Sequence, residues 1–127
     1  MKMSFPRSGR LLRHADFERV YKLGRRHFSA SMTVFYWQRE KAGDARGMRV
    51  GFTVSLALGG AVERNRMRRR LREAVRLSNL KPAFDADVVI NPKKAVLTAE
   101  FDTLRNEVQQ AFVAIDKKLR AREGLRS

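Results

Sequence analysis

Apolar residues recur along this chain with two different periods, and the periods predict where helices and strands lie. A helical period marks residues 14–23, which Gly24 is expected to end, and a period of two marks strands over residues 27–38 and 49–55. We expect these two strands to pair as a hairpin, because the polar turn 40–47 lies between them. The apolar face of the first strand is predicted to carry Phe28, Ala30, Met32, Val34 and Tyr36.

Two long helices and one short strand complete the predicted order. Helical periodicity covers residues 61–80 and 99–122, with Thr98 as the cap of the second helix. The apolar run 86–90 between them suits a buried strand that Pro92 ends. The order α-β-β-α-β-α indicates an α+β protein with helices packed on a mixed sheet, in which the strands on either side of the first long helix form a parallel crossover.

The length of 127 residues suits one domain, which we place at residues 11–122. Residues 1–10 are predicted to form a flexible basic arm and residues 123–127 a C-terminal tail. The chain has no cysteine, which excludes disulfides, thiolate metal ligands and a cysteine nucleophile. No stretch approaches the roughly 20 apolar residues that a membrane span requires, and we expect a cytoplasmic protein.

Charge changes this picture more than the rest of the composition does. Lys and Arg number 28 against 13 Asp and Glu, which gives a net charge of +15. Seven arginines fall between Arg64 and Arg76, inside a predicted helix. Arginine matches phosphate oxygens with paired hydrogen bonds. The chain is therefore expected to bind a polyanion, nucleic acid in the first place and an acidic membrane surface in the second.

At about 100° per residue, the predicted arginine helix separates a buried stripe from a basic face. The stripe comprises Met67, Leu71, Ala74, Val75 and Ser78. The main basic face comprises Arg64, Asn65, Arg68, Arg69, Arg72 and Arg76, with Arg66 and Arg70 on the far flank. A solvated helix with internal ion pairs is the alternative, but Glu63 and Glu73 cannot neutralise seven arginines. The preceding Gly59-Gly60 either presents backbone N–H groups to a phosphate or forms a plain tight turn.

A second candidate surface combines aromatic and basic side chains, as sites for single-stranded nucleic acid do. Phe17 and Tyr21 lie four residues apart on the first predicted helix, and Phe35 and Trp37 point away from the apolar face of the first strand. Nearby positive charge comes from Arg13, Lys22, Arg25 and Arg26. Aromatic residues at helical spacing also suit a hydrophobic core, so the pattern alone leaves both interpretations open.

Candidate catalytic groups are sparse. His14 and His27 could act as acid and base, but no lysine or carboxylate spacing ties them into a two-histidine ribonuclease site. Asp85 and Asp87 could suggest a metal pair, although a loop end is the better explanation. No Walker loop, nucleophile elbow or zinc spacing occurs, so the chain alone is not expected to be an enzyme.

Residues 49–73 read RVGFTVSLALGGAVERNRMRRRLRE, and this run resembles the protein subunit of bacterial ribonuclease P. In that family a strand with R-V-G-x-x-V-S leads through a glycine loop to A-V-x-R-N-R and a basic helix. The pair Asp16-Phe17, with Tyr21 and Gly24, matches the family's first helix, and the DVVI run and the final helix also fit. The resemblance covers about residues 10–115.

The resemblance implies a two-layer α+β sandwich whose mixed sheet has a left-handed βαβ crossover, the fold of the second domain of ribosomal protein S5. It implies the protein cofactor of a ribonucleoprotein endonuclease that removes the 5′ leader from precursor tRNA by phosphodiester hydrolysis, with a broadened substrate range. The RNA subunit, bound one to one, would supply the active site and hold Mg²⁺. The protein would then contain no catalytic residue, bind no cofactor or metal, be inactive alone and have no DNA or membrane partner.

The resemblance also implies two binding sites. Contact with the catalytic RNA falls to Arg64, Asn65, Arg66, Arg68, Arg69 and Arg72, and contact with the 5′ leader to Phe17, Tyr21, Phe35 and Arg13. Where the family usually has two lysines after V-S, this chain has Leu56 and Ala57, and we expect Arg70 to compensate in part. Two alternatives stay open: a ribosomal-type structural RNA-binding protein without a role in cleavage, and a DNA-binding protein with the arginine helix in a major groove.

Overall fold

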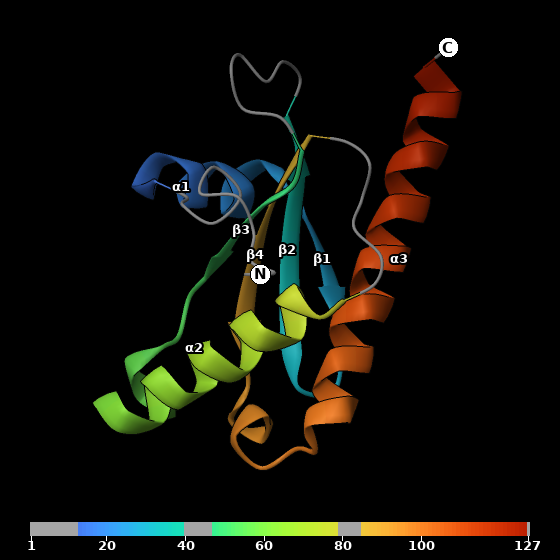
Figure 1. The fold of residues 1–127 in the computed structure, drawn as a ribbon. Helices are drawn as coiled ribbons and strands as arrows, with labels where there is room; N and C mark the ends of the chain where they lie inside the picture. The colour runs from blue at the N-terminus through green and yellow to red at the C-terminus, as the bar shows by residue number, and fades with distance from the viewer. Residues whose placement is uncertain (1–12, 40–46, 79–84, 127) are drawn as a thin grey trace, which may run out of the picture.

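A computed structural model describes residues 13–39, 47–78 and 85–126 of the chain. Within these residues, a four-stranded sheet carries α2 and α3 on one face and α1 on the other (Figure 1). The elements are α1 (His14–Leu23), β1 (Arg25–Phe28), β2 (Met32–Gln38), β3 (Arg49–Phe52), η2 (Leu56–Leu58), α2 (Ala61–Arg76), β4 (Ala86–Pro92), η3 (Lys94–Leu97) and α3 (Phe101–Arg126). The predicted arm at residues 1–10 and most of the predicted turn at 40–47 lie outside the described residues.

The strands follow the order β1-β2-β4-β3, with β2 antiparallel to both of its neighbours and β3 parallel to β4. The predicted hairpin between residues 27–38 and 49–55 is therefore wrong. All five residues of the apolar run 86–90 are buried, so β4 needs a strand on each side. Pairing β2 directly with β3 would have left this buried strand at an edge of the sheet.

The predicted parallel crossover of β3, α2 and β4 is present. In Figure 1 both strands run downward, α2 lies on the viewer's side of the sheet, and β4 lies to the right of β3. This connection is left-handed, as the resemblance implies and against the strong general preference for right-handed crossovers.

The predicted first strand is divided by a turn at residues 29–31 into β1 and β2. Ser29 donates its N–H to the Met32 carbonyl (3.0 Å), and Glu107 of α3 accepts from the Ser29 hydroxyl (2.7 Å) and the Ser31 N–H (2.8 Å). The turn corrects the prediction for Phe28, which is 64% exposed on the α1 side of the sheet. Ala30 is exposed in the turn itself.

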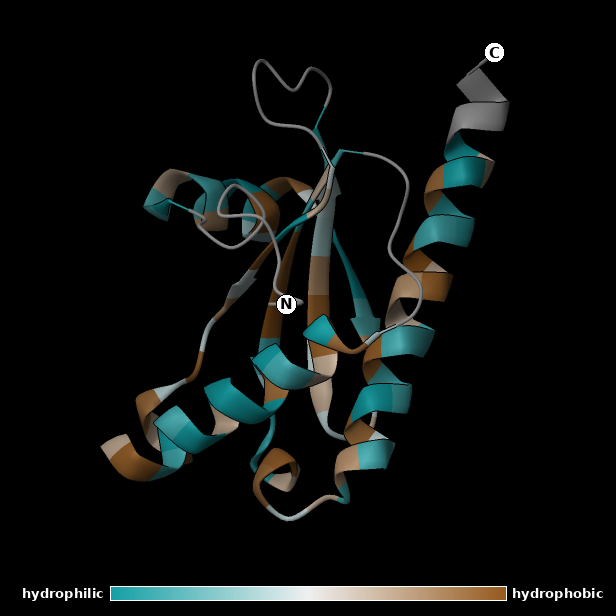
Figure 2. Cartoon of the chain, viewed as in Figure 1, coloured by the Kyte–Doolittle hydropathy of each residue, from teal (hydrophilic) through white to brown (hydrophobic). Residues whose placement is uncertain are grey.

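The core lies between the sheet and the pair α2 and α3, and Figure 2 shows apolar residues through the centre of the sheet with hydrophilic ones along much of α2. The stripe predicted for α2 is confirmed, because all five of its residues are buried. On α3 the apolar residues at helical spacing are buried, with Phe101 partly buried: Leu104, Val108, Ala111, Phe112, Ile115 and Leu119.

Several element boundaries differ from the predictions. Helix α2 ends at Arg76 instead of residue 80, because the Ser78 hydroxyl and N–H both turn back to the Val75 carbonyl. Thr98 ends η3 instead of capping α3, which starts at Phe101 and continues to Arg126. Strand β3 ends at Phe52 instead of residue 55, and Pro92 is the last residue of β4.

Gly24 ends α1, as predicted, because helix and sheet approach each other closely there. A Cβ on this residue would lie 2.4 Å from the Tyr36 carbonyl oxygen and 2.5 Å from that of Val20. Its φ of −86° is open to any residue, so space alone requires the glycine. The contact seats the end of α1 directly on β2.

Candidate nucleic-acid interface

The outer side of α2 presents a shallow basic hollow of about 390 Å³. We call its polar lining the arginine face: Asn65, Arg68, Arg69 and Arg72. Arg68 donates from Nη1 to the Asn65 side-chain oxygen (3.0 Å), while Arg69 and Arg72 make no hydrogen bond or ion pair with the described residues. Exposed guanidinium groups in one hollow, without carboxylate partners, suit a polyanion.

Both carboxylates of α2 are engaged at its two ends. Glu63 accepts the Gly60 N–H at 3.1 Å in the first turn, and Glu73 pairs with Arg76 in the last turn. The alternative of a helix neutralised by its own ion pairs therefore fails for the middle of α2. Gly60 is held by the protein's own carboxylate, and Gly59 has a φ of +146°, so Gly59-Gly60 has the features of a tight turn and not of an open phosphate site.

The other predicted RNA-binding arginines lie apart from this hollow. Arg64 turns back and donates from Nε to the Gly59 carbonyl (3.2 Å), and Arg66 is exposed on the flank of the helix. Arg70 donates to the Ala99 carbonyl in front of α3. This contact links α2 to the residues before α3, and partial compensation by Arg70 for the missing lysines at Leu56 and Ala57 stays a prediction.

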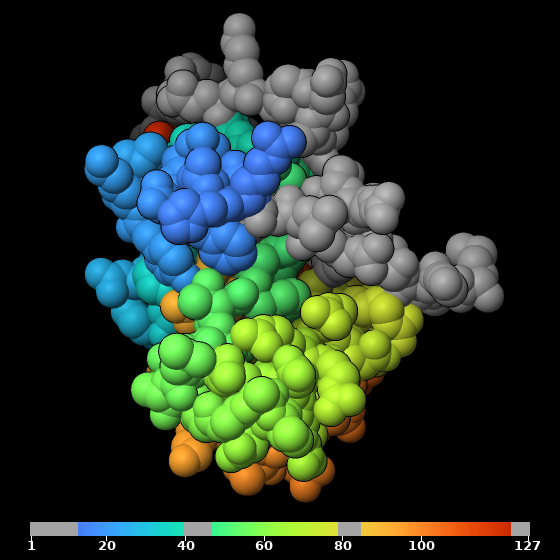
Figure 3. Space-filling model, turned by 90° about the vertical axis from the view of Figure 1, so that its left-hand side faces the viewer, coloured from blue at the N-terminus to red at the C-terminus, as the bar shows by residue number. Residues whose placement is uncertain are grey.

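An open cleft of about 400 Å³ separates α1 from the end of β3 and from α2. Figure 3 views this side of the molecule, with α1 above α2 and the β3 segment between them. We call it the aromatic cleft, and its lining comprises His14, Phe17, Glu18, Tyr21, Phe52, Thr53, Val54 and Arg68. Arg68 thus belongs to the arginine face and to the aromatic cleft at once.

The ring of Tyr21 is fixed by contacts on two sides. Its hydroxyl lies 2.9 Å from Thr53 Oγ1 and 3.0 Å from Asn91 Oδ1. Because the phenol has one proton and the amide oxygen can only accept, Tyr21 donates to Asn91 and accepts from Thr53. The ring meets Phe35 edge to face, with centroids 4.8 Å apart and planes at 81°. Tyr21 remains 40% exposed, so an ordered aromatic residue faces solvent.

The structure brings together three of the four residues predicted for the leader site. Phe17 and Tyr21 line the cleft, and Phe35 supports Tyr21 from the sheet. Arg13 is exposed at the start of α1 and is not part of the cleft lining. Trp37, a further aromatic candidate, lies beneath the Arg19 guanidinium at 5.5 Å from its ring centre.

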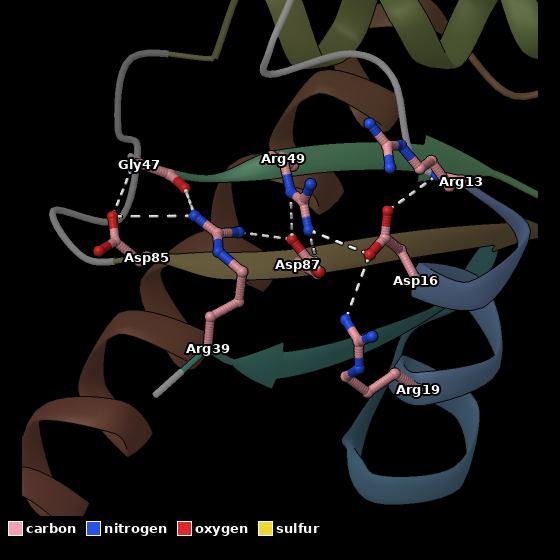
Figure 4. A network of polar contacts seen from close by, with 8 residues as sticks. All are labelled: Arg13, Asp16, Arg19, Arg39, Gly47, Arg49, Asp85 and Asp87. Carbon is pink, nitrogen blue, oxygen red and sulfur yellow. Dashed lines mark hydrogen bonds and ion pairs between the residues drawn. The ribbon is translucent and has the colours of Figure 1, made fainter. Parts of the chain in front are cut away.

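A buried ion-pair network fixes α1, the upper wall of the cleft, against the sheet (Figure 4). Asp87 on β4 is fully buried and accepts from Arg39 Nη1 (2.5 Å) and from Arg49 Nε and Nη2 (both 2.7 Å). Arg49 Nη2 also reaches Asp16 of α1 at 3.3 Å, and Asp16 accepts the Arg13 N–H at 2.9 Å. Sequence reasoning missed this network, whose members come from three distant parts of the chain.

Two members of this network, Asp16 and Arg49, have shifted pKa values that favour their charged forms. Burial acts to raise the pKa of Asp16, but the hydrogen bond from the Arg13 backbone and the charges of Arg49 and Arg19 outweigh it. The pKa of Asp16 therefore lies below its ordinary value of 3.8. The hydrogen bonds to Asp87 raise the pKa of Arg49.

The two histidines lie on opposite sides of the sheet. His14 is exposed beside the cleft and lies 3.0 Å from Glu18. His27 pairs with Val34 on the α3 side, where burial and the charge of Lys118 lower its pKa. They cannot act on one substrate as acid and base.

Within the described segments no group of three metal-ligating side chains occurs, and Asp87 is engaged by arginines instead of a second carboxylate. None of the helices in this part of the chain is long and apolar enough to cross a membrane.

Comparison with known proteins assigns the family. The model of the Ribonuclease P family matches residues 5–116. A ribonuclease P protein component of Geobacter sp. is 37% identical over 119 residues, covering 91% of this chain and 95% of that protein. One from Oleidesulfovibrio alaskensis is 42% identical over 88 residues, covering 69% of each chain.

Solved structures agree at the level of the fold. The RNase P protein of Staphylococcus aureus superimposes with a TM-score of 0.68 at 24% identity, covering 86% of this chain and 95% of that one. The RNase P protein of Thermotoga maritima gives a TM-score of 0.69 at 23% identity, covering 81% and 94%. With the sequence match over most of its length, this chain belongs to the family of bacterial ribonuclease P protein components.

Proposed function

We propose that this chain assembles with ribonuclease P RNA through the arginine face and holds the 5′ leader of precursor tRNA in the aromatic cleft. The RNA subunit supplies the catalytic groups and holds the Mg²⁺ ions, and the protein contributes binding and orientation. Hydrolysis of the phosphodiester bond then releases the leader. The proposal agrees with the membership of the family and with the absence of an acid-base pair among the described histidines.

The shared position of Arg68 carries the proposal. Its side chain lines the arginine face and the aromatic cleft, so an RNA on α2 and a strand in the cleft would meet at this residue. A leader has to be held next to the catalytic RNA for the bond at its end to be cut. A single guanidinium between the two surfaces supports that juxtaposition.

The chemistry of the cleft favours a single strand. Aromatic side chains bind unpaired bases by stacking on their faces, which are hidden in a duplex. Tyr21 presents a fixed, partly exposed ring, and Phe17 lies on the same wall one helical turn earlier. Arg68 and the high net positive charge supply attraction for the phosphates.

Reconstitution with a bacterial ribonuclease P RNA tests both surfaces separately. In a gel-shift titration, Arg69→Gln with Arg72→Gln is expected to weaken binding of the RNA subunit. Phe17→Ala should leave that binding unchanged but weaken the affinity of the holoenzyme for precursor tRNA that carries a leader. Val113→Ala, a truncation of an exposed apolar residue on α3, serves as the matched control.

Cleavage at low magnesium distinguishes this function from the alternatives. The wild-type chain is expected to stimulate cleavage at the mature 5′ end and to cleave nothing without the RNA. Binding without stimulation would indicate a structural RNA-binding protein, and a preference for duplex DNA would indicate a groove-binding helix.

A further inference from the structure

We infer that the leader site continues beyond the aromatic cleft, across the sheet to its β1 edge, and ends on Phe28 as a stacking position for a more distant leader nucleotide. This inference rests on the proposed function, because it extends the path of the same strand. It assigns a ligand to an exposed aromatic residue that the fold does not use.

The α1 side of the sheet carries a continuous row of aromatic and guanidinium groups. Residues directly opposite each other in neighbouring strands share a face, and Arg26 lies opposite Phe35 while Phe28 lies opposite Thr33. From the cleft outward, the Tyr21 and Phe35 centroids are 4.8 Å apart, and the Arg26 guanidinium carbon lies 5.8 Å from the Phe35 ring centre and 5.9 Å from that of Phe28.

Phe28 is poorly explained as part of the core. It is 64% exposed on a four-residue edge strand, and the buried core cluster on the other face of the sheet does not include it. Among the described residues, the guanidinium of Arg26 lies within cation–π distance of the Phe28 ring. A base can therefore stack on the remaining ring surface.

The charges beside Phe28 indicate a nucleotide as the occupant. Arg26 is exposed and makes no ion pair with a described carboxylate, so its guanidinium is available to a phosphate. Lys93 places a second cation at this edge, because its Nζ donates to the carbonyl of Ser29, the residue after Phe28 (2.9 Å). An exposed ring beside two cations offers one contact for a base and another for its phosphate.

The topology sets the order in which a strand would meet these groups. Arg68 and Thr53 mark the β3 side of the sheet, where the cleft adjoins α2, whereas Phe28 lies on β1 at the opposite edge. A leader that starts at Arg68 would pass Tyr21 and Phe35 before it reaches Phe28. Only leaders long enough to cross the sheet can use this position.

A leader-length series tests the inference on the reconstituted holoenzyme. Precursor tRNAs with leaders from one to about ten nucleotides, within the span of known single-strand sites, are titrated against wild type and Phe28→Ala. We expect equal affinity for the shortest leaders and about five- to tenfold weaker binding of Phe28→Ala for the longest. Phe28→Trp should restore the affinity, and Val113→Ala should match wild type throughout.

The length dependence separates this inference from the proposed function. Phe17→Ala should already weaken binding at shorter leaders than Phe28→Ala does. Phe28→Ala equal to wild type at every length, with Phe17→Ala impaired, would overturn the inference and leave the cleft intact. Equal affinity of both variants and wild type would refute the leader cleft itself. A loss for Phe28→Ala that is the same at all lengths would also overturn the inference, since it would assign the ring to the RNA subunit, another partner or the fold.

Discussion

Replacing Asp87 with asparagine tests whether the buried ion pairs hold α1 and the sheet together. The carboxylate is fully buried and accepts three hydrogen bonds from Arg39 and Arg49. Asparagine nearly keeps the volume but removes the charge, which leaves two largely buried guanidinium groups without their counter-ion. Removing one partner of a buried ion pair costs about 3–5 kcal/mol. That is a large part of the roughly 5–15 kcal/mol by which a domain is stable.

Urea denaturation followed by far-UV circular dichroism measures this loss. With an m-value of about 1–3 kcal/mol/M, the midpoint should fall by about 1 M or more. Asp102→Asn is the matched control, because it removes the same charge from a side chain that is 82% exposed and 3.6 Å from Arg105. Asp102→Asn should lower the free energy of unfolding by less than about 1 kcal/mol. Equal midpoints for the two variants would show that the network does not stabilise the fold.

Three further changes test other parts of the account. Gly24→Ala should lower the free energy of unfolding by about 1–3 kcal/mol, and the urea midpoint with it, because its Cβ would meet the Tyr36 carbonyl oxygen at 2.4 Å; an unchanged midpoint would contradict this close approach. Tyr21→Phe should keep leader affinity within about twofold, whereas Tyr21→Ala should weaken it about fivefold or more, and a titration in which both lose equally would assign the effect to the hydroxyl. Burial acts to raise the pKa of Glu107, but hydrogen bonds from the two serines of the β1–β2 turn outweigh it and hold the pKa below 4.5. The stabilisation that the Glu107 carboxylate gives the fold is therefore complete above pH 4.5 and is lost as the pH falls through the lower pKa of the folded state. Glu107→Gln should flatten the fall of the urea midpoint between pH 6 and pH 3. A variant with the same pH profile as wild type would contradict this role of Glu107.

The helices were predictable because their buried faces are encoded in local spacing. Met67, Leu71 and Phe112 follow the helical period, and each is fully buried. Strand pairing is not local, and the alternation in residues 32–38 is equally compatible with β3 or β4 as a neighbour. The prediction failed on that choice, and the buried run of β4 explains why.

The candidate site was predicted in its residue types and missed in its connections. The arginine pattern and the family resemblance pointed to α2, and the aromatic spacing to Phe17 and Tyr21. The dual position of Arg68 depends on how α1 and α2 are placed across the sheet, which no spacing encodes. The prediction placed Phe28 on the apolar face because it is apolar and fits the alternation of the strand. The small residues 29–31 that follow it are a turn signal that the prediction did not use.

The salt dependence of RNA binding tests the central role of the arginine face most directly. The dissociation constant of the wild-type chain and ribonuclease P RNA is measured across a salt series beside a triple variant, Arg68→Gln, Arg69→Gln and Arg72→Gln. If each arginine neutralises one phosphate, the slope of log affinity against log salt should become shallower by about 2 to 3. A control that removes the same charge from exposed positions on α3 (Lys117, Lys118 and Arg120, each to Gln) should keep the wild-type slope. Equal slopes and affinities for the triple variant and wild type would contradict the assignment of this face to RNA.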